Sequence, residues 1–358
     1  MSSISDTTSL VTISSGSGNM AINDTFPASA SNEYDNSKQL RRDSSLCELQ
    51  ARSPAEIIMS IYNDLTWSLT RDLILCVACF IFGVHGPKEF ILPIMGMTMR
   101  PIPYQVTGAG DVLIDLTLAN EMIPKSDVAF PSEKLWFISL WLPISTVICL
   151  GSAFPLIVST LSNNNPLHNI HAGTCAVLVA IGISELVTQI FKFYVGRLRP
   201  NFYAMCGFDK ETLECTNGEK MEMEARMSFP SGHSSLSFCG LVCVVLFFLG
   251  RVGLGRNIGS TVASGRGKVL TVMSFTPLLL SFWCATSRLV DNWHHPSDII
   301  AGSILGSVSA CIAYHIWFPH ILSVHSGIPL SVLRSEDKIG SDYLIAEKSL
   351  SLPVYNNS

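Results

Sequence analysis

Six long apolar runs constrain the fold of this chain more than any other feature. A helix needs about 20 apolar residues to cross the hydrocarbon layer of a bilayer, where it satisfies its own backbone hydrogen bonds. With 48% of its residues hydrophobic and 14% charged, the chain is too apolar for an ordinary soluble domain. We therefore expect an all-α fold, an integral membrane bundle of six helices. The runs cover residues 73–84, 135–161, 170–194, 234–249, 269–285 and 299–318.

The first run is shorter than a bilayer requires, so we expect its helix to borrow residues from its flanks or to tilt. Apolar residues at helical spacing from Ile57 to Leu69 predict an amphipathic lead-in at the membrane interface. Residues 86–134 are expected to form an extramembrane loop, in which apolar pieces such as residues 90–99 could re-enter the membrane. In the second run, Pro143 and Pro155 predict kinks.

The two ends of the chain are polar. Residues 1–51 predict a disordered cytoplasmic tail, residues 52–320 the six-span domain, and residues 321–358 a polar cytoplasmic tail. Six spans place both ends on one side of the membrane, and the loop between spans four and five marks that side as cytoplasmic by its cations. These cations are Arg251, Arg256, Arg266 and Lys268. The net charge of −5 is spread out, which excludes the basic face that nucleic-acid binding needs.

The stretch SRLVDNWHHPSD, from Ser287 to Asp298, separates the last two apolar runs. Charged residues and histidines at a membrane boundary are expensive and point to a reaction centre. If Pro296 lies in the first turn of the following helix, His294 and Asp298 share one helix face. The carboxylate of Asp298 can then accept a proton-bearing nitrogen of His294, which leaves the other ring nitrogen free as a nucleophile.

A zinc site is the competing interpretation of this stretch, because His294, His295, Asp291 and Asp298 can all bind zinc. We disfavour it, since the spacing lacks the usual ligand pairs and nearby cations would repel a metal ion. We expect no metal. His295 is then a neighbour at the membrane interface, and Trp293 a residue of the aromatic belt.

The end of the third run, KFYVGRLRP, carries Lys192 and Arg199 seven residues apart. Two helical turns separate them by about 10 Å along the axis, so both can point to one side, and Pro200 then ends the helix. A point charge and a bidentate fork together suit a phosphate group. The alternative is snorkelling of cations to the interface, to which we assign Arg197.

The segment FPSGHSS begins the fourth run. Glycine lets backbone N–H groups approach a ligand, and a helix N-terminus adds partial positive charge, so Pro230, Ser231 and Gly232 predict an anion site. His233 is placed to donate a proton to a leaving oxygen. The segment alone is more typical of a simple helix cap beside a satisfied histidine.

Taken together, these three segments resemble the type 2 phosphatidate phosphatase superfamily, whose pattern is KxxxxxxRP, PSGH and SRxxxxxHxxxD. All eleven specified positions match in order. The segments RPIPYQ, from Arg100 to Gln105, and RPNFYAMC, from Arg199 to Cys206, make the chain most similar to the eukaryotic lipid phosphate phosphatases. The resemblance places the active site at the non-cytoplasmic ends of helices three to six. The facing compartment is then the lumen or the outside, in the plasma membrane, endoplasmic reticulum, Golgi or vacuole.

The resemblance implies a phosphomonoesterase that needs no metal or other cofactor and acts on phospholipid in the bilayer, through a phosphohistidine. His294 would attack phosphorus, His233 would protonate the departing alcohol, and Asp298 would orient His294. The phosphate would be held by Lys192, Arg199, Ser231, Gly232 and Arg288. Substrates would include phosphatidic acid, lysophosphatidic acid and sphingoid-base phosphates. Two hypotheses compete with this one: a phosphatase for diphosphate lipids, and an anion transporter that catalyses no reaction. The oligomeric state stays open.

Cys206 and Cys215 are the only cysteines expected in an outer loop. Oxidising conditions there permit a bond between them, so we predict a disulfide that closes the loop beside the active site.

Overall fold

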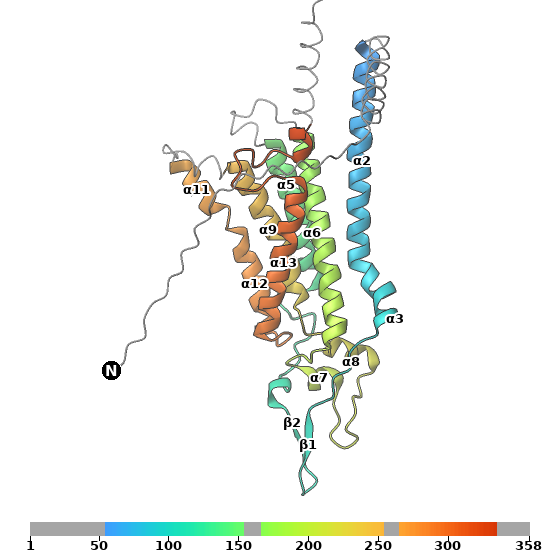
Figure 1. Cartoon of the computed structure of the whole chain (residues 1–358). Helices are drawn as coiled ribbons and strands as arrows, with labels where there is room; N and C mark the ends of the chain where they lie inside the picture. Colours follow the sequence, from blue (N-terminus) through green and yellow to red (C-terminus); the bar gives the residue numbers. More distant parts are fainter. Residues whose placement is uncertain (1–53, 154–165, 254–264, 335–358) are drawn as a thin grey trace, which may run out of the picture. The chain divides into compact units, whose positions relative to one another are not determined.

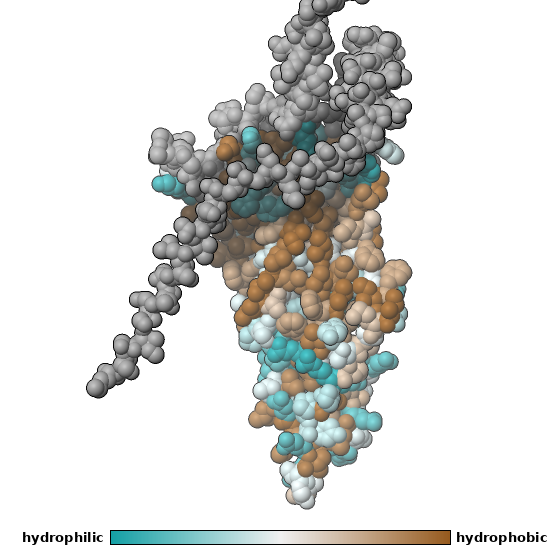
Figure 2. All heavy atoms as spheres, in the orientation of Figure 1, coloured by the Kyte–Doolittle hydropathy of each residue, from teal (hydrophilic) through white to brown (hydrophobic). Residues whose placement is uncertain are grey.

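The computed structural model describes residues 54–153, 166–253 and 265–334. The predicted tail at residues 1–51 and most of the predicted C-terminal tail lie outside these ranges. Residues from Trp67 onward form one compact unit. Within the described residues, six helical segments are long and apolar enough to cross a membrane. Figure 2 shows hydrophobic side chains over the helices and hydrophilic ones toward the loops at one end of this unit.

The first span is longer than its apolar core suggested. Helix α2 runs over Pro54–Gly86, a π-helical turn η1 over Pro87–Ile91, and α3 over Leu92–Met95. The expected extramembrane loop is therefore wrong for residues 87–95, which continue the helix and complete a candidate span at Thr66–Met95. Prolines are tolerated here because each stands in the first turn of its segment, where no backbone N–H is needed.

The second span contains an irregular turn. It consists of α4 (Ser132–Trp136), the π-helical η3 (Phe137–Trp141) and α5 (Leu142–Ala153). Pro143 cannot donate a hydrogen bond to Ser139, so the irregular turn stands where the kink was predicted. The carbonyl of Ser139 lies against Gly240, where an added Cβ would stand 2.1 Å from its oxygen. The predicted kink at Pro155 falls outside the described residues.

The other helices of the bundle are α6 (Pro166–Val195), α9 (Gly232–Val252), α11 (Gly265–Met273), α12 (Pro277–Val290) and α13 (Pro296–Trp317). Helix α9 is central among them (Figure 1). It packs against α13, α12, α6 and η3, and most of its side chains are buried.

Glycines set the close approach of α13 to α9. A Cβ at Gly306 would lie 2.0 Å from the carbonyl oxygen of Ser235, and one at Gly302 would lie 2.5 Å from that of Ser231. Small residues at such positions let membrane helices pack backbone to backbone. This packing fixes the start of α13, and with it Asp298, against the start of α9.

The loops at one end of the bundle form a small layer of their own (Figure 1). A hairpin pairs Tyr104–Val106 (β1) with Val112–Ile114 (β2), and Tyr104 stands opposite Ile114. Apart from this short hairpin, the named elements of the described residues are helical, so the expected all-α fold is confirmed. The short segments η2 (Leu116–Leu118), α7 (Phe202–Cys206) and α8 (Glu219–Ala225) complete the layer. A disulfide joins Cys206 to Cys215 there.

Candidate active site

Lys192 lies in the last turn of α6, which ends at Val195. Gly196 ends the helix with a left-handed backbone (φ +54°), and its N–H donates to the carbonyl of Lys192. The expectation that Arg199 continues this helix is therefore wrong, because the helix ends at Val195, five residues before Pro200. Arg199 approaches the site from the following non-helical segment.

Arg199 is buried between aromatic and acidic neighbours. Its guanidinium stacks over the ring of Trp293 at 4.7 Å and lies 4.0 Å from a carboxylate oxygen of Glu224. Burial lowers the pKa of Arg199 to about 10, and the charge of Glu224 opposes this shift. Arg199 stays charged at neutral pH. Trp293 is only 6% exposed and belongs to the core of the loop layer, so its assignment to an aromatic belt is wrong.

Ser231, Gly232 and His233 begin α9. Ser231 is fully buried, and its hydroxyl accepts hydrogen bonds from the backbone and side chain of Ser234. It caps the helix and does not line the cavity described below, in contrast to its expected contact with phosphate. Gly232 lies at the cavity, where an added methyl group would stand 3.2 Å from the Nζ atom of Lys192. The backbone of Gly232 and the ammonium of Lys192 therefore meet at one point.

His233 projects into the same space. Its Nε2 atom is 2.9 Å from the carbonyl oxygen of Phe130. A carbonyl only accepts, so Nε2 carries a proton and Nδ1 is the nitrogen left for other chemistry.

Arg288 lies in the last turn of α12 and is 2% exposed. Its guanidinium donates to the carboxylate of Asp291 at 2.6 Å and to the hydroxyl of Ser287 at 3.0 Å. Asp291 is therefore engaged with an arginine. The pair holds the Arg288 fork at the cavity wall.

His294 precedes α13 and is 4% exposed. Its Nδ1 atom donates to the carbonyl oxygen of Ser228 at 2.7 Å, whereas the Oδ2 atom of Asp298 is 3.8 Å away. The predicted direct hydrogen bond to Asp298 is thus absent, because His294 stands before the helix and not on its face. Burial lowers the pKa of His294 to about 4, with Asp298 opposing and Arg199 assisting the shift. At neutral pH the ring is uncharged, and Nε2 keeps a free lone pair.

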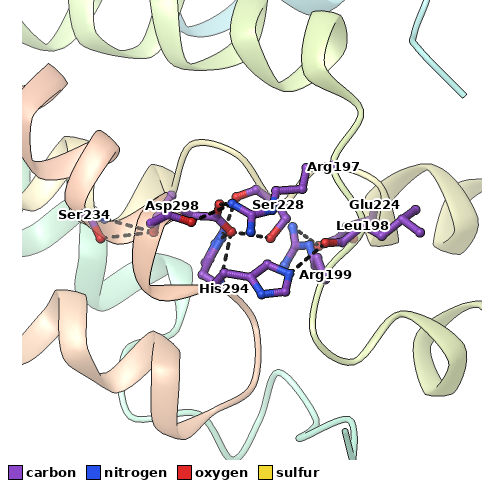
Figure 3. Close-up of polar contacts among 11 residues, drawn as sticks. Arg197, Leu198, Arg199, Glu224, Ser228, Ser234, His294 and Asp298 are labelled. Carbon is purple, nitrogen blue, oxygen red and sulfur yellow. Dashed lines mark hydrogen bonds and ion pairs between the residues drawn. The ribbon is translucent and has the colours of Figure 1, made fainter. Parts of the chain in front are cut away.

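Asp298 is fully buried and accepts three hydrogen bonds (Figure 3). The donors are the hydroxyl of Ser228 at 2.6 Å, the backbone N–H of His295 at 3.0 Å and the guanidinium of Arg197 at 2.5 Å. Arg197, assigned above to snorkelling, instead neutralises this carboxylate. His295 caps α13, and its Nε2 atom is 3.1 Å from the carbonyl oxygen of Leu198, so it is more than a neighbour at the interface.

These groups surround one cavity of about 290 Å³. Three cations, two histidines and one backbone glycine of the predicted set line it, together with two residues that the sequence did not single out for the site, Lys125 and Glu224. These two form an ion pair of 2.9 Å. Burial alone would raise the pKa of Glu224, but its hydrogen bond from Lys125 and the charge of Arg199 hold it below its ordinary value. The predicted residues on the wall are Lys192, Arg199, Gly232, His233, Arg288 and His294.

Zinc chemistry needs several ligands at one point. Within the described ranges, no three His, Cys, Asp or Glu side chains are grouped so that they could hold a metal ion. The candidate ligands of the SRLVDNWHHPSD stretch are engaged separately, Asp291 with Arg288 and Asp298 with Arg197.

The sequence missed two kinds of site residue: those that hold the predicted residues in place and those that line the cavity themselves. Ser228 offers a backbone carbonyl to His294, which leaves no trace in the side-chain pattern. Arg197 could have been found, because it lies two residues from Arg199 in the same motif. Lys125 lies in a loop and Glu224 on the short helix α8, both outside any motif, and only the folded loop layer brings them to the cavity.

The chain is similar in sequence to known proteins. The sequence model of the PAP2 superfamily matches residues 173–321. A PA-phosphatase related-family protein of Dictyostelium discoideum is 28% identical over 299 residues, which are 83% of this chain and 97% of that protein. Lipid phosphate phosphatase 2 of Arabidopsis thaliana is 30% identical over 218 residues, 58% of this chain and 67% of that one.

A third relative, named probable diacylglycerol pyrophosphate phosphatase 1, comes from Schizosaccharomyces pombe. It is 29% identical over 217 residues, 58% of this chain and 71% of its own length. No solved structure shows significant similarity. With six candidate spans and a cationic cavity lined by the matched motifs, the chain belongs to the PAP2 superfamily, as a multi-pass membrane protein of the lipid phosphate phosphatase type.

Proposed function

We propose that this protein hydrolyses phosphate monoesters of lipids at the edge of the membrane, without a metal ion. Its substrates are phosphatidic acid, lysophosphatidic acid and sphingoid-base phosphates. The observation that carries the proposal is the meeting of Lys192, Arg199 and Arg288 with two histidines around one cavity. To catalyse phosphoryl transfer, a protein mainly has to hold positive charges in fixed positions around the phosphoryl group.

The reaction has two steps. In the first, the free Nε2 atom of His294 attacks phosphorus, and an N–P bond forms as the P–O bond to the lipid alcohol breaks. His233 enters this step as an imidazolium, and its Nδ1 proton goes to the departing oxygen while its Nε2 proton stays hydrogen-bonded to the carbonyl of Phe130. In the second, water attacks the phosphohistidine while His233 takes up its proton. The N–P bond breaks, and inorganic phosphate leaves.

The phosphoryl oxygens are held by the three cations and the backbone N–H of Gly232. Helix α9 contributes the partial positive charge of its first turn. Asp298 acts on His294 through Ser228, whose hydroxyl it accepts and whose carbonyl holds the ring. Ser231 supports the site as the cap of α9.

The cavity faces the lumen or the outside of the cell, in the plasma membrane or in the membrane of the endoplasmic reticulum, Golgi or vacuole. The disulfide between Cys206 and Cys215 supports this side, because such bonds persist in oxidising compartments.

Purified protein in detergent, given phosphatidic acid in EDTA, tests the proposal. We expect release of inorganic phosphate by the wild type and none by His294→Ala. Full activity in His294→Ala would exclude the mechanism, and binding of phosphate without any hydrolysis would favour an anion transporter. A diphosphate lipid in the same panel tests the activity that the name of the S. pombe relative suggests.

A further inference from the structure

Glu185 is a buried carboxylate inside the third span. It lies on α6, two helical turns before Lys192, and is 8% exposed. One carboxylate oxygen, Oε1, accepts a hydrogen bond from the amide of Gln189 at 2.5 Å. The other, Oε2, has no hydrogen-bond partner among the described residues. A buried carboxylate oxygen without a donor is expensive in a membrane protein, and this makes Glu185 a candidate for binding a ligand.

A second cavity, of about 330 Å³, brings Glu185 to the active site. Its wall includes Lys192 and His233, which also line the cavity of the active site. The two spaces therefore meet at the phosphate position. Apolar side chains, among them Val84 and Leu135, complete the second cavity.

The crossing of α2 and α6 fixes where the second cavity, called the lateral cavity below, ends. Gly83 lies so close to Gly182 that an added Cβ would stand 2.2 Å from the carbonyl oxygen of Gly182. Glu185 follows Gly182 by almost one turn. The two helices are thus in backbone contact just before Glu185, and the cavity opens between this contact and Lys192.

We propose that Glu185 determines substrate specificity by accepting a hydrogen bond from a hydroxyl or ammonium group next to the phosphate of the lipid. The inference rests on the proposed function. A phosphate held at Lys192 and His233 leaves the first carbons of the lipid in the lateral cavity, among apolar side chains and one unpaired carboxylate oxygen. Lysophosphatidate offers a hydroxyl there, and a sphingoid-base phosphate offers a hydroxyl and an ammonium group. Phosphatidate carries an ester instead, which donates nothing.

The chemistry of discrimination favours this role. A site that hydrogen-bonds a donor rejects an analogue without it, because a buried acceptor is then left unpaired. Lys88 and Lys192 line the same cavity, and the charge of Lys192 attracts the carboxylate, but no ion pair joins either lysine to Glu185 within the described residues. The unpaired oxygen is therefore available to a lipid.

The test crosses two enzymes with two lipids. Wild type and Glu185→Leu are each given oleoyl lysophosphatidate and the analogue that lacks only its hydroxyl, in EDTA. We expect the wild-type kcat/KM to be about tenfold or more higher for the lipid with the hydroxyl, since a hydrogen bond to a charged group is worth this much. In Glu185→Leu the ratio should fall to about one. An equal ratio in both enzymes would overturn the inference, whereas hydrolysis of neither lipid by the wild type would refute the proposed function instead.

The ratio of two substrates is independent of how much enzyme is folded, so a poorly folded variant still gives an answer. Glu185→Gln keeps a carbonyl acceptor and removes the charge. Given a sphingoid-base phosphate and its N-acylated analogue, it should lose the preference for the free ammonium group while it keeps the preference for the hydroxyl. Glu89→Gln, an exposed carboxylate on η1, is the matched control and should leave both ratios as in the wild type. Wild-type ratios in both Glu185 variants would contradict the proposal.

Discussion

The Nδ1 atom of His294 lies 3.8 Å from the Oδ2 atom of Asp298, and the two residues are joined through Ser228. The carbonyl of Ser228 accepts the proton of His294, and its hydroxyl donates to Asp298. The carboxylate therefore positions the histidine indirectly, through Ser228. It also holds Arg197, which supplies the charge that a buried carboxylate needs.

Removal of Arg197 tests this arrangement. Arg197→Ala leaves the fully buried Asp298 without its cation, so Ser228 and His294 lose their fixed position. We expect kcat to fall about tenfold or more, because an unpaired buried carboxylate is strongly destabilised and its movement displaces His294. KM should change little, because Arg197 does not line the cavity. Arg71→Ala, an exposed arginine on α2, is the control. If both variants keep wild-type kcat in a phosphate-release assay, Arg197 is only an interfacial cation.

The low pKa of His294 predicts how inactivation depends on pH. A histidine with a pKa of about 4 stays neutral where an ordinary one, with a pKa of about 6.5, would already be protonated. Diethyl pyrocarbonate modifies neutral histidines, and bound phosphate should protect His294 from it. The rate of modification of His294 should therefore stay high down to about pH 5 and fall as pH drops through about 4. A midpoint near 6.5 would show that burial does not hold the ring neutral. Arg199→Gln, which removes a neighbouring positive charge, should move the midpoint upward.

Packing of α13 on α9 predicts a stability effect far from the chemistry. Gly306→Val places a side chain against the backbone of Ser235, with the first atom 2.0 Å from its oxygen. The helices must separate, and overpacking of this kind destabilises proteins by about 1 to 3 kcal/mol. Thermal unfolding in detergent should show a lower Tm. Gly108→Ala has open space around it and should leave Tm unchanged; equal Tm values for the two variants would argue against this packing.

The sequence predicted the six helices well and the geometry of the site only in part. Apolar runs identify spans because the bilayer imposes both length and helical structure. The extent of the first span escaped prediction, since Pro87 suggested a loop where a π-helical turn carries the helix onward. The prediction for Arg199 was wrong for a related reason. Gly196 ends α6 early, and helical periodicity alone does not reveal where a helix ends. The partner of His294 is a backbone carbonyl, for which no residue type is a signal.

The disulfide predicts a loss of stability in the loop layer. Cys206→Ser with Cys215→Ser opens a loop of sequence separation 9, and in the chain-entropy model such a bond contributes roughly 2 to 3 kcal/mol. We expect the double variant to have a lower Tm than the wild type. In the wild type, the peptide that contains both cysteines should react with a thiol reagent only after reduction. Reaction before reduction, in protein isolated without reductant, would mean that the bond is not formed in the cell.

In the proposed reaction, His294 carries the phosphoryl group. Wild-type protein, mixed with a lipid phosphate labelled in its phosphate and quenched in alkali within one turnover, should hold label that mass spectrometry assigns to His294. The label should be absent from His294→Ala and present in His295→Ala, because the side chain of His295 faces the carbonyl of Leu198 and does not line the cavity. Label on no residue, with full phosphate release in the same mixture, would contradict the account.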